Sequence, residues 1–465
     1  IRTKQVAAPS RMAQAQKVAA PVNVAPRGLV ILVNFRDVTF ETSKAEMDSM
    51  LIGKNYTRDY SYNYGGRKYF VTSEGSAWKY FYDSSNGHYD PQFDVIGPVT
   101  VSKDMAYYGK NNPSTDFDNA PWTMVKEACQ LVDDSVDFSL YDNDKDGYVD
   151  FVYVIYAGYG EADGGEENTI WPHSYWLLDA GITCKVDGKY VDLYACGNEM
   201  DSYTNHHTGI GTFCHEFSHV LGLPDLYETT GNGTHKTLGS WSILDYGPYN
   251  NDGNTPPAYS AYEQFFMGWL TPRLIVDPEN VVLNELQTSD NALLISTSDE
   301  HNLLGNDPKP TTFYMVENRQ QVGWDEYIPG HGMMLTKIQY SSNTWMGNTV
   351  NNNARKMGVD LIEADGKTPD IYSSGFDGKE GDLFPAGATE YTAIEGHTIE
   401  NIKEENGVIY FRFKGGVETS TEEVPSHEDI TAIYNILGQK QTTLDIESLP
   451  HGTYVVVTPT TNKKT

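Results

Sequence analysis

Cysteine is scarce in this sequence: 465 residues contain only four, at Cys129, Cys184, Cys196 and Cys214. So few cysteines exclude the disulfide scaffold of a small secreted domain. Cys184 and Cys196 flank an expected hairpin turn at residues 187–188, which would place Cys184 near Val191, so a bond between these two cysteines is allowed but not implied. We expect Cys129 and Cys214 to behave as small buried apolar groups.

Basic residues are also few, with 33 Lys and Arg against 64 Asp and Glu and a formal net charge of -31. We therefore expect no nucleic-acid partner and no binding to anionic membranes, because both require a basic surface. The acidic balance is compatible with solubility outside the cell and with binding of hard cations such as Ca²⁺. No apolar run reaches the roughly 18 residues of a membrane-spanning helix. The N-terminus lacks the apolar stretch of a signal peptide, so we expect any such peptide to be already absent.

Length and changes of composition predict several domains. Residues 1–27, rich in Ala, Val, Gln and Pro, are expected to be a leader or the remnant of a propeptide. Residues 28–270 are the first large expected domain. Residues 271–415 consist of short alternating runs separated by Gly, Asn, Asp and Pro, which is typical of a β-sandwich-like domain. A polar linker at residues 416–429 precedes a strand-like segment at residues 430–465, which is too short to hold a core of its own.

Hydrophobic periodicity predicts the elements that surround the motifs. The uninterrupted apolar run LVILVNF predicts a central strand at residues 29–35. Further strands are expected at residues 92–101, 151–157 and 169–173, and helices at residues 73–81, 120–136 and 258–270.

The stretch TFCHEFSHVLGLPDLY, residues 212–227, carries the HExxH pattern in His215, Glu216 and His219. Side chains four residues apart lie on one face of a helix, so the two imidazoles can bind a single Zn²⁺. Glu216 then lies beside the metal-activated water, where a carboxylate acts as general base. The alternative is a chance match whose histidines are satisfied by ordinary hydrogen bonds. The pattern predicts a zinc hydrolase.

Gly222 and Asp225 extend the pattern to HExxHxxGxxD. A glycine lets the chain turn back toward the metal, which puts Asp225 at the spacing of a third zinc ligand. Glu263, in the later expected helix, is the rival for this role. His206 and His207 precede the motif, and we expect them to be structural or solvated rather than ligands.

A second candidate metal site lies in the segment DNDKDGYVD, residues 142–150. Asp142, Asp144, Asp146 and Asp150 match the first part of an EF-hand calcium loop. The bidentate Glu at the twelfth position is replaced by Tyr153, so a complete EF-hand is not expected. The alternatives are a structural Ca²⁺ site and a solvated acidic turn.

Several blocks of this sequence resemble the immune inhibitor A family of secreted zinc metallopeptidases, which is related to the metzincins. They include DNDKDGYVDFVYVIYAGYGE, HEFSHVLGLPDLY, SWSILDYG and SAYEQFFMGWL, and the similarity extends over roughly residues 28–415. The resemblance implies an α+β fold: a metzincin-like catalytic domain, a β-sandwich-like domain and a short β C-terminal segment. It implies zinc ligands at His215, His219 and Asp225, and a general base and acid at Glu216.

The resemblance also places the metzincin Met-turn at residues 242–246, where Leu244 stands at the Met position. A Leu for Met exchange in a packing position usually costs less than about 1.5 kcal/mol. Tyr246, two residues later, matches a tyrosine that stabilises the transition state in some metzincins, and the alternative is a packing role. The segment from YNILGQKQ to GTYVVVTP is similar to C-terminal sorting-type modules of secreted Bacteroidetes proteins.

These features together predict a secreted zinc endopeptidase that acts on protein or peptide substrates. Two other classes stay open: a zinc amidase acting on a non-protein substrate, and a secreted adhesion or binding protein with a vestigial zinc site. The sequence indicates no oligomeric state and no subsite preference.

Overall fold

The computed structural model describes residues 26–114, 117–231, 235–367, 377–417, 432–435, 439–443 and 454–457. Residues 1–415 form one compact unit and residues 416–465 form a second. Most of the predicted leader and of the predicted linker lies outside the described residues, and the division of the larger unit at residue 270 stays a prediction. None of the described helices has the length and apolar composition needed to cross a bilayer.

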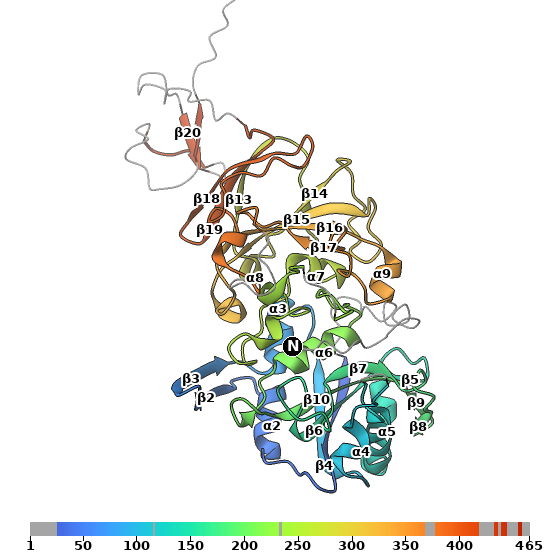
Figure 1. The fold of residues 1–465 in the computed structure, drawn as a ribbon. Coiled ribbons are helices and arrows are strands. Elements are labelled where there is room, and N and C mark those ends of the chain that lie inside the picture. Colours follow the sequence, from blue (N-terminus) through green and yellow to red (C-terminus); the bar gives the residue numbers. More distant parts are fainter. Residues whose placement is uncertain are drawn as a thin grey trace, which may run out of the picture. The chain divides into compact units, whose positions relative to one another are not determined.

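A six-stranded sheet underlies the candidate site (Figure 1). Its strands are β1 (Arg27–Asn34), β4 (Gln92–Thr100), β6 (Val152–Tyr159), β7 (His173–Trp176), β10 (Leu193–Asp201) and β11 (His206–His207). The order is β11-β10-β6-β1-β4, and β7 also pairs with β10. The pairs β1–β4, β1–β6 and β6–β10 are parallel, whereas β7 and β11 run antiparallel to β10. The strands predicted at residues 29–35, 92–101 and 151–157 are confirmed.

Both faces of this sheet are buried, which explains the uninterrupted apolar run of β1. Val30 and Leu32 belong to one core, and Leu29, Ile31 and Val33 belong to another. The first core includes residues of α2 (Lys44–Ile52), α3 (Ala77–Ser84) and α6 (Gly211–Val220). The second includes residues of α4 (Met105–Gly109), α5 (Pro121–Val132) and the 3₁₀ helix η2 (Phe138–Tyr141). Helices on both faces give a mixed α/β architecture.

Four predicted elements differ from the structure. The helix predicted at residues 73–81 starts only at Ala77, because Ser76 is its N-cap and accepts a hydrogen bond from Lys79 N at 3.2 Å. The preceding residues form β3 (Arg67–Glu74), a hairpin with β2 (Thr57–Tyr64). The strand predicted at residues 169–173 is absent, since β7 begins at His173. The helices predicted at residues 120–136 and 258–270 form as the shorter α5 and α7 (Ala261–Phe266).

The hairpin predicted at residues 187–188 is confirmed. It joins β8 (Cys184–Val186) to β9 (Lys189–Val191), which also pairs with β5 (Tyr148–Val149). Cys184 lies opposite Val191, as its spacing predicted. All four cysteines are buried and free, so Cys184 and Cys196 are not bonded to each other.

Between residues 271 and 415 the described part of the chain forms two further sheets. One has the order β12-β14-β15-β16-β17 and the other the order β13-β19-β18. The strands are β12 (Arg273–Leu274), β13 (Glu279–Leu283), β14 (Leu293–Ser296), β15 (Thr312–Arg319), β16 (Gly332–Gln339), β17 (Val359–Leu361), β18 (Ile399–Glu405) and β19 (Val408–Phe413). The same part holds the short helices α8 (Leu286–Ser289), α9 (Ser342–Met346), η5 (Gly323–Asp325) and η6 (Glu380–Asp382). Two more, η3 (Gly239–Trp241) and η4 (Gly247–Tyr249), precede α7.

Strand β15 contributes to two different cores. Tyr314 and Val316 share a core with residues of β13 and β19. Phe313 and Met315, which point to the opposite face, belong to the core that also contains α6. The five-stranded sheet therefore packs on the same core as the candidate site.

The second unit contains β20 (Ala432–Asn435), which pairs antiparallel with β21 (Tyr454–Val457). The predicted strand character of residues 430–465 is confirmed for these two elements.

Candidate metal centre

Helix α6 divides the HExxH stretch into a buried face and a site face. Phe213 and Phe217 are buried among aromatic side chains of the first core. His215 and His219 lie on the other face. Gly222, with φ of 94°, ends the helix in the left-handed region that favours glycine, and its N–H donates to the carbonyl of His219 at 2.9 Å. This turn brings Asp225 back to the two histidines.

The three candidate ligands form a nearly equilateral triangle. His215 Nε2 lies 3.3 Å from His219 Nε2, and Asp225 Oδ1 lies 3.3 Å from His215 Nε2 and 3.2 Å from His219 Nε2. Three ligand atoms at zinc bond lengths and tetrahedral angles would be about 3.3 Å apart. Asp225 Oδ1 is buried and has no hydrogen-bond partner of good geometry within the described residues. These side chains therefore fit a tetrahedral zinc ion.

Hydrogen bonds at the far side of each imidazole orient the ring. His215 Nδ1 lies 2.7 Å from the carbonyl oxygen of Ile243, and His219 Nδ1 lies 2.8 Å from that of Leu223. A carbonyl only accepts, so each Nδ1 carries the proton and donates it. Each Nε2 is then left to bind a metal, which is the usual arrangement of zinc-bound histidine.

The charges of the triangle favour a shared cation. Burial alone would lower the pKa of His219, but the Asp225 carboxylate outweighs burial and raises that pKa to about 9. Burial would raise the pKa of Asp225, but the two histidines outweigh it and hold that pKa far below its ordinary value. The site thus retains an ionised carboxylate and attracts positive charge.

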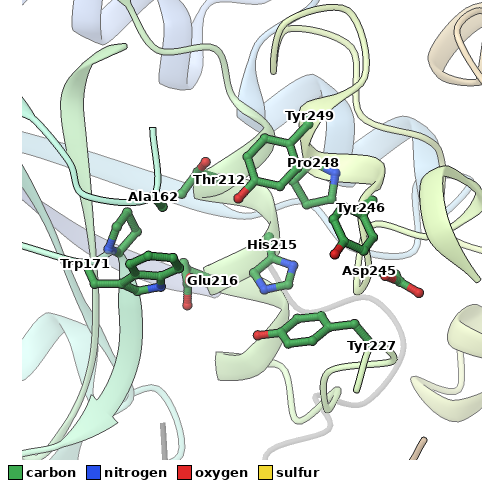
Figure 2. Close-up of a pocket in the computed structure, with 11 residues that line it drawn as sticks. Ala162, Trp171, Thr212, His215, Glu216, Tyr227, Asp245, Tyr246, Pro248 and Tyr249 are labelled. Atoms are coloured by element: carbon green, nitrogen blue, oxygen red, sulfur yellow. The ribbon is translucent and has the colours of Figure 1, made fainter. Parts of the chain in front are cut away.

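Glu216 lies beside the triangle in a pocket with aromatic walls. Burial raises the pKa of its carboxyl, although the two neighbouring histidines oppose the shift. Figure 2 shows Trp171 on the Glu216 side of the pocket, and Tyr227 and Tyr246 near His215. The lining residues are Ala162, Trp171, Pro172, Thr212, His215, Glu216, Tyr227, Asp245, Tyr246, Pro248 and Tyr249.

Tyr246, singled out in the sequence, does line this pocket. Burial raises the pKa of its phenol to about 12, so it stays a hydrogen-bond donor at neutral pH. Leu244, at the predicted Met position, is fully buried in the first core. The segment around it supports the centre, because Ile243 accepts the His215 hydrogen bond and Leu244 O accepts one from Leu226 N at 2.8 Å.

The sequence reasoning missed Tyr227, Tyr249 and Trp171. The Tyr227 ring stacks against His215, with centroids 6.4 Å apart and an interplanar angle of 20°. Tyr227 lies only two residues after Asp225, and this closeness to a candidate ligand could have predicted that it lines the site. Tyr249 ends η4, three residues after Tyr246, so its closeness to the predicted Met-turn was its signal. Trp171 comes from a distant loop, and no local pattern marks it.

Glu263 and the upstream histidines are engaged elsewhere. Glu263 is fully buried and caps α7, accepting hydrogen bonds from Ser242 Oγ and Ser260 N at 2.6 Å each. His207 Nδ1 lies 2.9 Å from Thr208 O, and the His206 ring packs against Tyr60 at a tilt of 50°. None of these three side chains belongs to the described metal-ligand group.

The acidic loop brings Asp142, Asp144 and Asp146 together, with ligand atoms within 4.8 Å of one another. Asp142 is buried, and its Oδ2 accepts hydrogen bonds from Lys189 Nζ at 2.6 Å and Gly147 N at 3.1 Å. Its Oδ1 is buried without a hydrogen-bond partner among the described residues. Asp150, the fourth predicted ligand, is not in this group.

Asp150 instead accepts a hydrogen bond from the backbone N–H of Asn143 at 2.7 Å. Burial raises the pKa of its carboxyl to about 6. The side-chain amide of Asn143 donates to the same oxygen, and the two hydrogen bonds offset part of this shift.

Comparison with known proteins agrees with this geometry. Residues 15–270 match the family described as Immune inhibitor A peptidase M6, catalytic domain. The chain is 27% identical over 304 residues to the pre-pro-metalloprotease PrtV of Vibrio cholerae serotype O1 (strain M66-2), which covers 58% of this chain and 33% of PrtV. It is 27% identical over 269 residues to Immune inhibitor A of Bacillus thuringiensis subsp. alesti, which covers 51% of this chain and 39% of that protein. The matched region is thus well under half the length of either relative.

Proposed function

The chain belongs to the immune inhibitor A peptidase M6 family of zinc metalloproteases, and from this premise we propose that it hydrolyses internal peptide bonds of protein substrates. The observation that carries the proposal is the triangle of two imidazoles and a buried carboxylate oxygen beside Glu216, in which that oxygen has no hydrogen-bond donor of good geometry among the described residues. His215, His219 and Asp225 are the proposed zinc ligands. Glu263 is not proposed, because its carboxylate is already used by Ser242 and Ser260.

Zinc, when bound by these side chains, supplies a Lewis acid that polarises the scissile carbonyl and lowers the pKa of water. Glu216 is the proposed general base and takes a proton from the water that attacks the carbonyl carbon. The raised pKa of its buried carboxyl suits this role, since a stronger base accepts a proton more readily. Glu216 then returns that proton to the leaving amine as the C–N bond breaks.

Tyr246 is proposed to donate its hydroxyl proton in a hydrogen bond to the oxyanion that forms at the carbonyl. Its place in the pocket and its protonated state at neutral pH support this role. A preorganised donor of this kind stabilises charge that develops in the transition state.

The variant Glu216→Gln tests the proposal. It should retain one zinc per chain and lose about 10²–10⁴-fold of the turnover on a denatured protein, because the ligands remain and the base is gone. Glu300→Gln, which changes an exposed residue far along the chain, is the matched control and should be unaffected. Near-normal turnover of Glu216→Gln would contradict the mechanism.

The same assay separates the other two classes. A zinc amidase would be inhibited by a chelator yet leave denatured protein intact while it cleaves a peptidoglycan fragment. An adhesion protein with a vestigial site would bind a ligand without any cleavage that a chelator blocks. The intact set of His215, Glu216, His219 and Asp225 favours the peptidase.

We also propose the finer architecture. The mixed sheet with α6 beside it supports a metzincin-like catalytic domain at residues 28–270. The core shared by the sheets of β15 and β19 supports a β-sandwich-like domain at residues 271–415. The acidic composition and the sorting-like C-terminal segment support a secreted protein.

A structural Ca²⁺ at Asp142, Asp144 and Asp146 is a further part of the proposal. The buried, unpartnered Oδ1 of Asp142 supports it, because such an oxygen costs free energy unless a cation or donor meets it. Lys189 already neutralises the other oxygen of Asp142, so the loop would bind calcium with fewer free charges than an EF-hand.

A further inference from the structure

One support of the candidate metal centre comes from far along the chain. Asn348 lies just after α9, among the strands beyond residue 270. Its side-chain amide donates a hydrogen bond from Nδ2 to Asp225 Oδ2 at 2.6 Å. Its Oδ1 accepts a hydrogen bond from the backbone N–H of Asp225 at 2.7 Å. A single side chain therefore fixes both the carboxylate and the main chain of one proposed ligand.

The neighbouring residues hold the rest of the ligand loop. Asn352 Oδ1 accepts a hydrogen bond from Thr229 N at 2.8 Å, and Thr229 Oγ1 donates to the carbonyl of Asn348 at 2.8 Å. Asn351 Nδ2 donates to Leu226 O at 2.7 Å. The loop of residues 348–352 thus runs along the segment of residues 225–229 and bonds to it repeatedly.

This loop is itself held in place. Asn351 is fully buried and exchanges two hydrogen bonds with Val359 of β17, at 2.8 and 3.0 Å. Asn348 has φ of 51°, in the left-handed region that asparagine tolerates better than most residues. The five-stranded sheet therefore provides a fixed base for the contacts to Asp225.

The three proposed ligands differ in what orients them. His215 and His219 are oriented by backbone carbonyls 28 and 4 residues further along the chain, at Ile243 and Leu223. Asp225 is oriented by a side chain 123 residues later. Because Asn348 engages Oδ2, the carboxylate presents Oδ1 to the two Nε2 atoms. Without this contact the carboxyl group could rotate about its own bond.

We propose that Asn348 is a positioning residue for the metal centre and that the β-rich part of the chain completes the site. The inference rests on the proposed function in so far as it takes Asp225 for a zinc ligand. Removing a residue that hydrogen-bonds to a metal ligand commonly weakens metal binding by about 10–100-fold.

The test measures zinc affinity of the full chain by competition with a chromophoric chelator, with zinc as the only added metal. Asn348→Ala should weaken zinc binding by about 10–100-fold. Asn348→Asp should weaken it at least as much, because a second carboxylate would face Asp225 Oδ2 and repel it. The matched control is Asn353→Ala, which removes a neighbouring, exposed asparagine whose side chain accepts a hydrogen bond from Arg355 N; its zinc affinity should stay within about twofold of the parent.

A double-mutant cycle separates positioning from general damage to the fold. In an Asp225→Ala background, adding Asn348→Ala should change zinc affinity by no more than about twofold, since its target is gone. An equal loss in both backgrounds would overturn the proposal, and so would a loss in Asn353→Ala as large as that in Asn348→Ala. Unchanged zinc binding in Asn348→Ala would also overturn it. If the parent binds zinc but cleaves no protein, the proposed function fails, and the affinities still decide the role of Asn348.

Discussion

Replacing Arg319 by Met should strongly destabilise the larger unit. Arg319, at the end of β15, is almost completely buried together with Asp325 and Glu317, at side-chain exposures of 1%, 1% and 3%. Its guanidinium donates to Asp325 Oδ2 at 2.6 Å, to Asp325 Oδ1 at 2.5 Å and to Glu317 Oε1 at 3.2 Å. Removing one partner of a buried ion pair costs about 3–5 kcal/mol, because the remaining charge is buried without compensation.

The loss should depend on pH in a defined direction. Burial raises the pKa of Glu317 to about 7 even though Arg319 opposes the shift. Without the guanidinium, the pKa of Glu317 in the folded state rises further above the ordinary value of 4.5, which applies in the unfolded chain. At a pH between these two pKa values, the folded state holds a proton that the unfolded state has lost. Stability then increases as the pH falls through this window. The destabilisation should therefore be largest near pH 8 and smaller near pH 5.

Urea unfolding followed by tryptophan fluorescence at both pH values measures this effect. The matched control is Arg273→Met, which breaks the Arg273–Glu279 pair at side-chain exposures of 53% and 34%. An exposed pair contributes less than about 1 kcal/mol. The reasoning is refuted if the Arg319 variant loses no more stability than the Arg273 variant, or if its loss grows toward acidic pH.

Three further outcomes are expected. Asp225→Ala should lower zinc affinity by more than roughly 100-fold, the largest effect usual for residues that only hydrogen-bond to a metal ligand. Glu263→Gln should keep its zinc. Metal content after dialysis distinguishes the two residues, and the reverse pattern would make Glu263 the ligand. Tyr246→Phe should lower kcat by about 10²–10³-fold with little change in KM if its hydroxyl meets the oxyanion; a change of kcat within about threefold would indicate packing alone. Added Ca²⁺ should raise the melting temperature of the parent but not of Asp144→Ala, since a ligand stabilises only the state that binds it; equal melting temperatures with and without Ca²⁺ would contradict the site.

The elements that sequence alone predicted well are those set by local patterns. The uninterrupted apolar run of β1 indicates a strand whose side chains are buried on both faces of the sheet. The four-residue spacing of His215 and His219 reports one face of a helix, and the structure brings Asp225 to them as the glycine turn suggested. In each case a few neighbouring residues carry the whole signal.

Local reasoning failed where long-range contacts decide. The sequence predicts a helix from Ser73, but Ser73 and Glu74 pair with β2 as the end of β3. Trp171 enters the pocket from a distant loop, and its sequence neighbours do not show this. Asn348 is the strongest case, because nothing between it and Asp225 marks their contact.

Because β15 packs on two cores, gene recombination cannot separate the two parts of the chain without exposing apolar side chains. A break in the gene near codon 270 would separate Phe313 and Met315 from the core that they share with α6. The same cut would remove the asparagine that holds Asp225. The segment recognised as a peptidase domain, residues 15–270, is therefore shorter than the segment that must be inherited together. A transplanted peptidase would have to carry the five-stranded sheet with it.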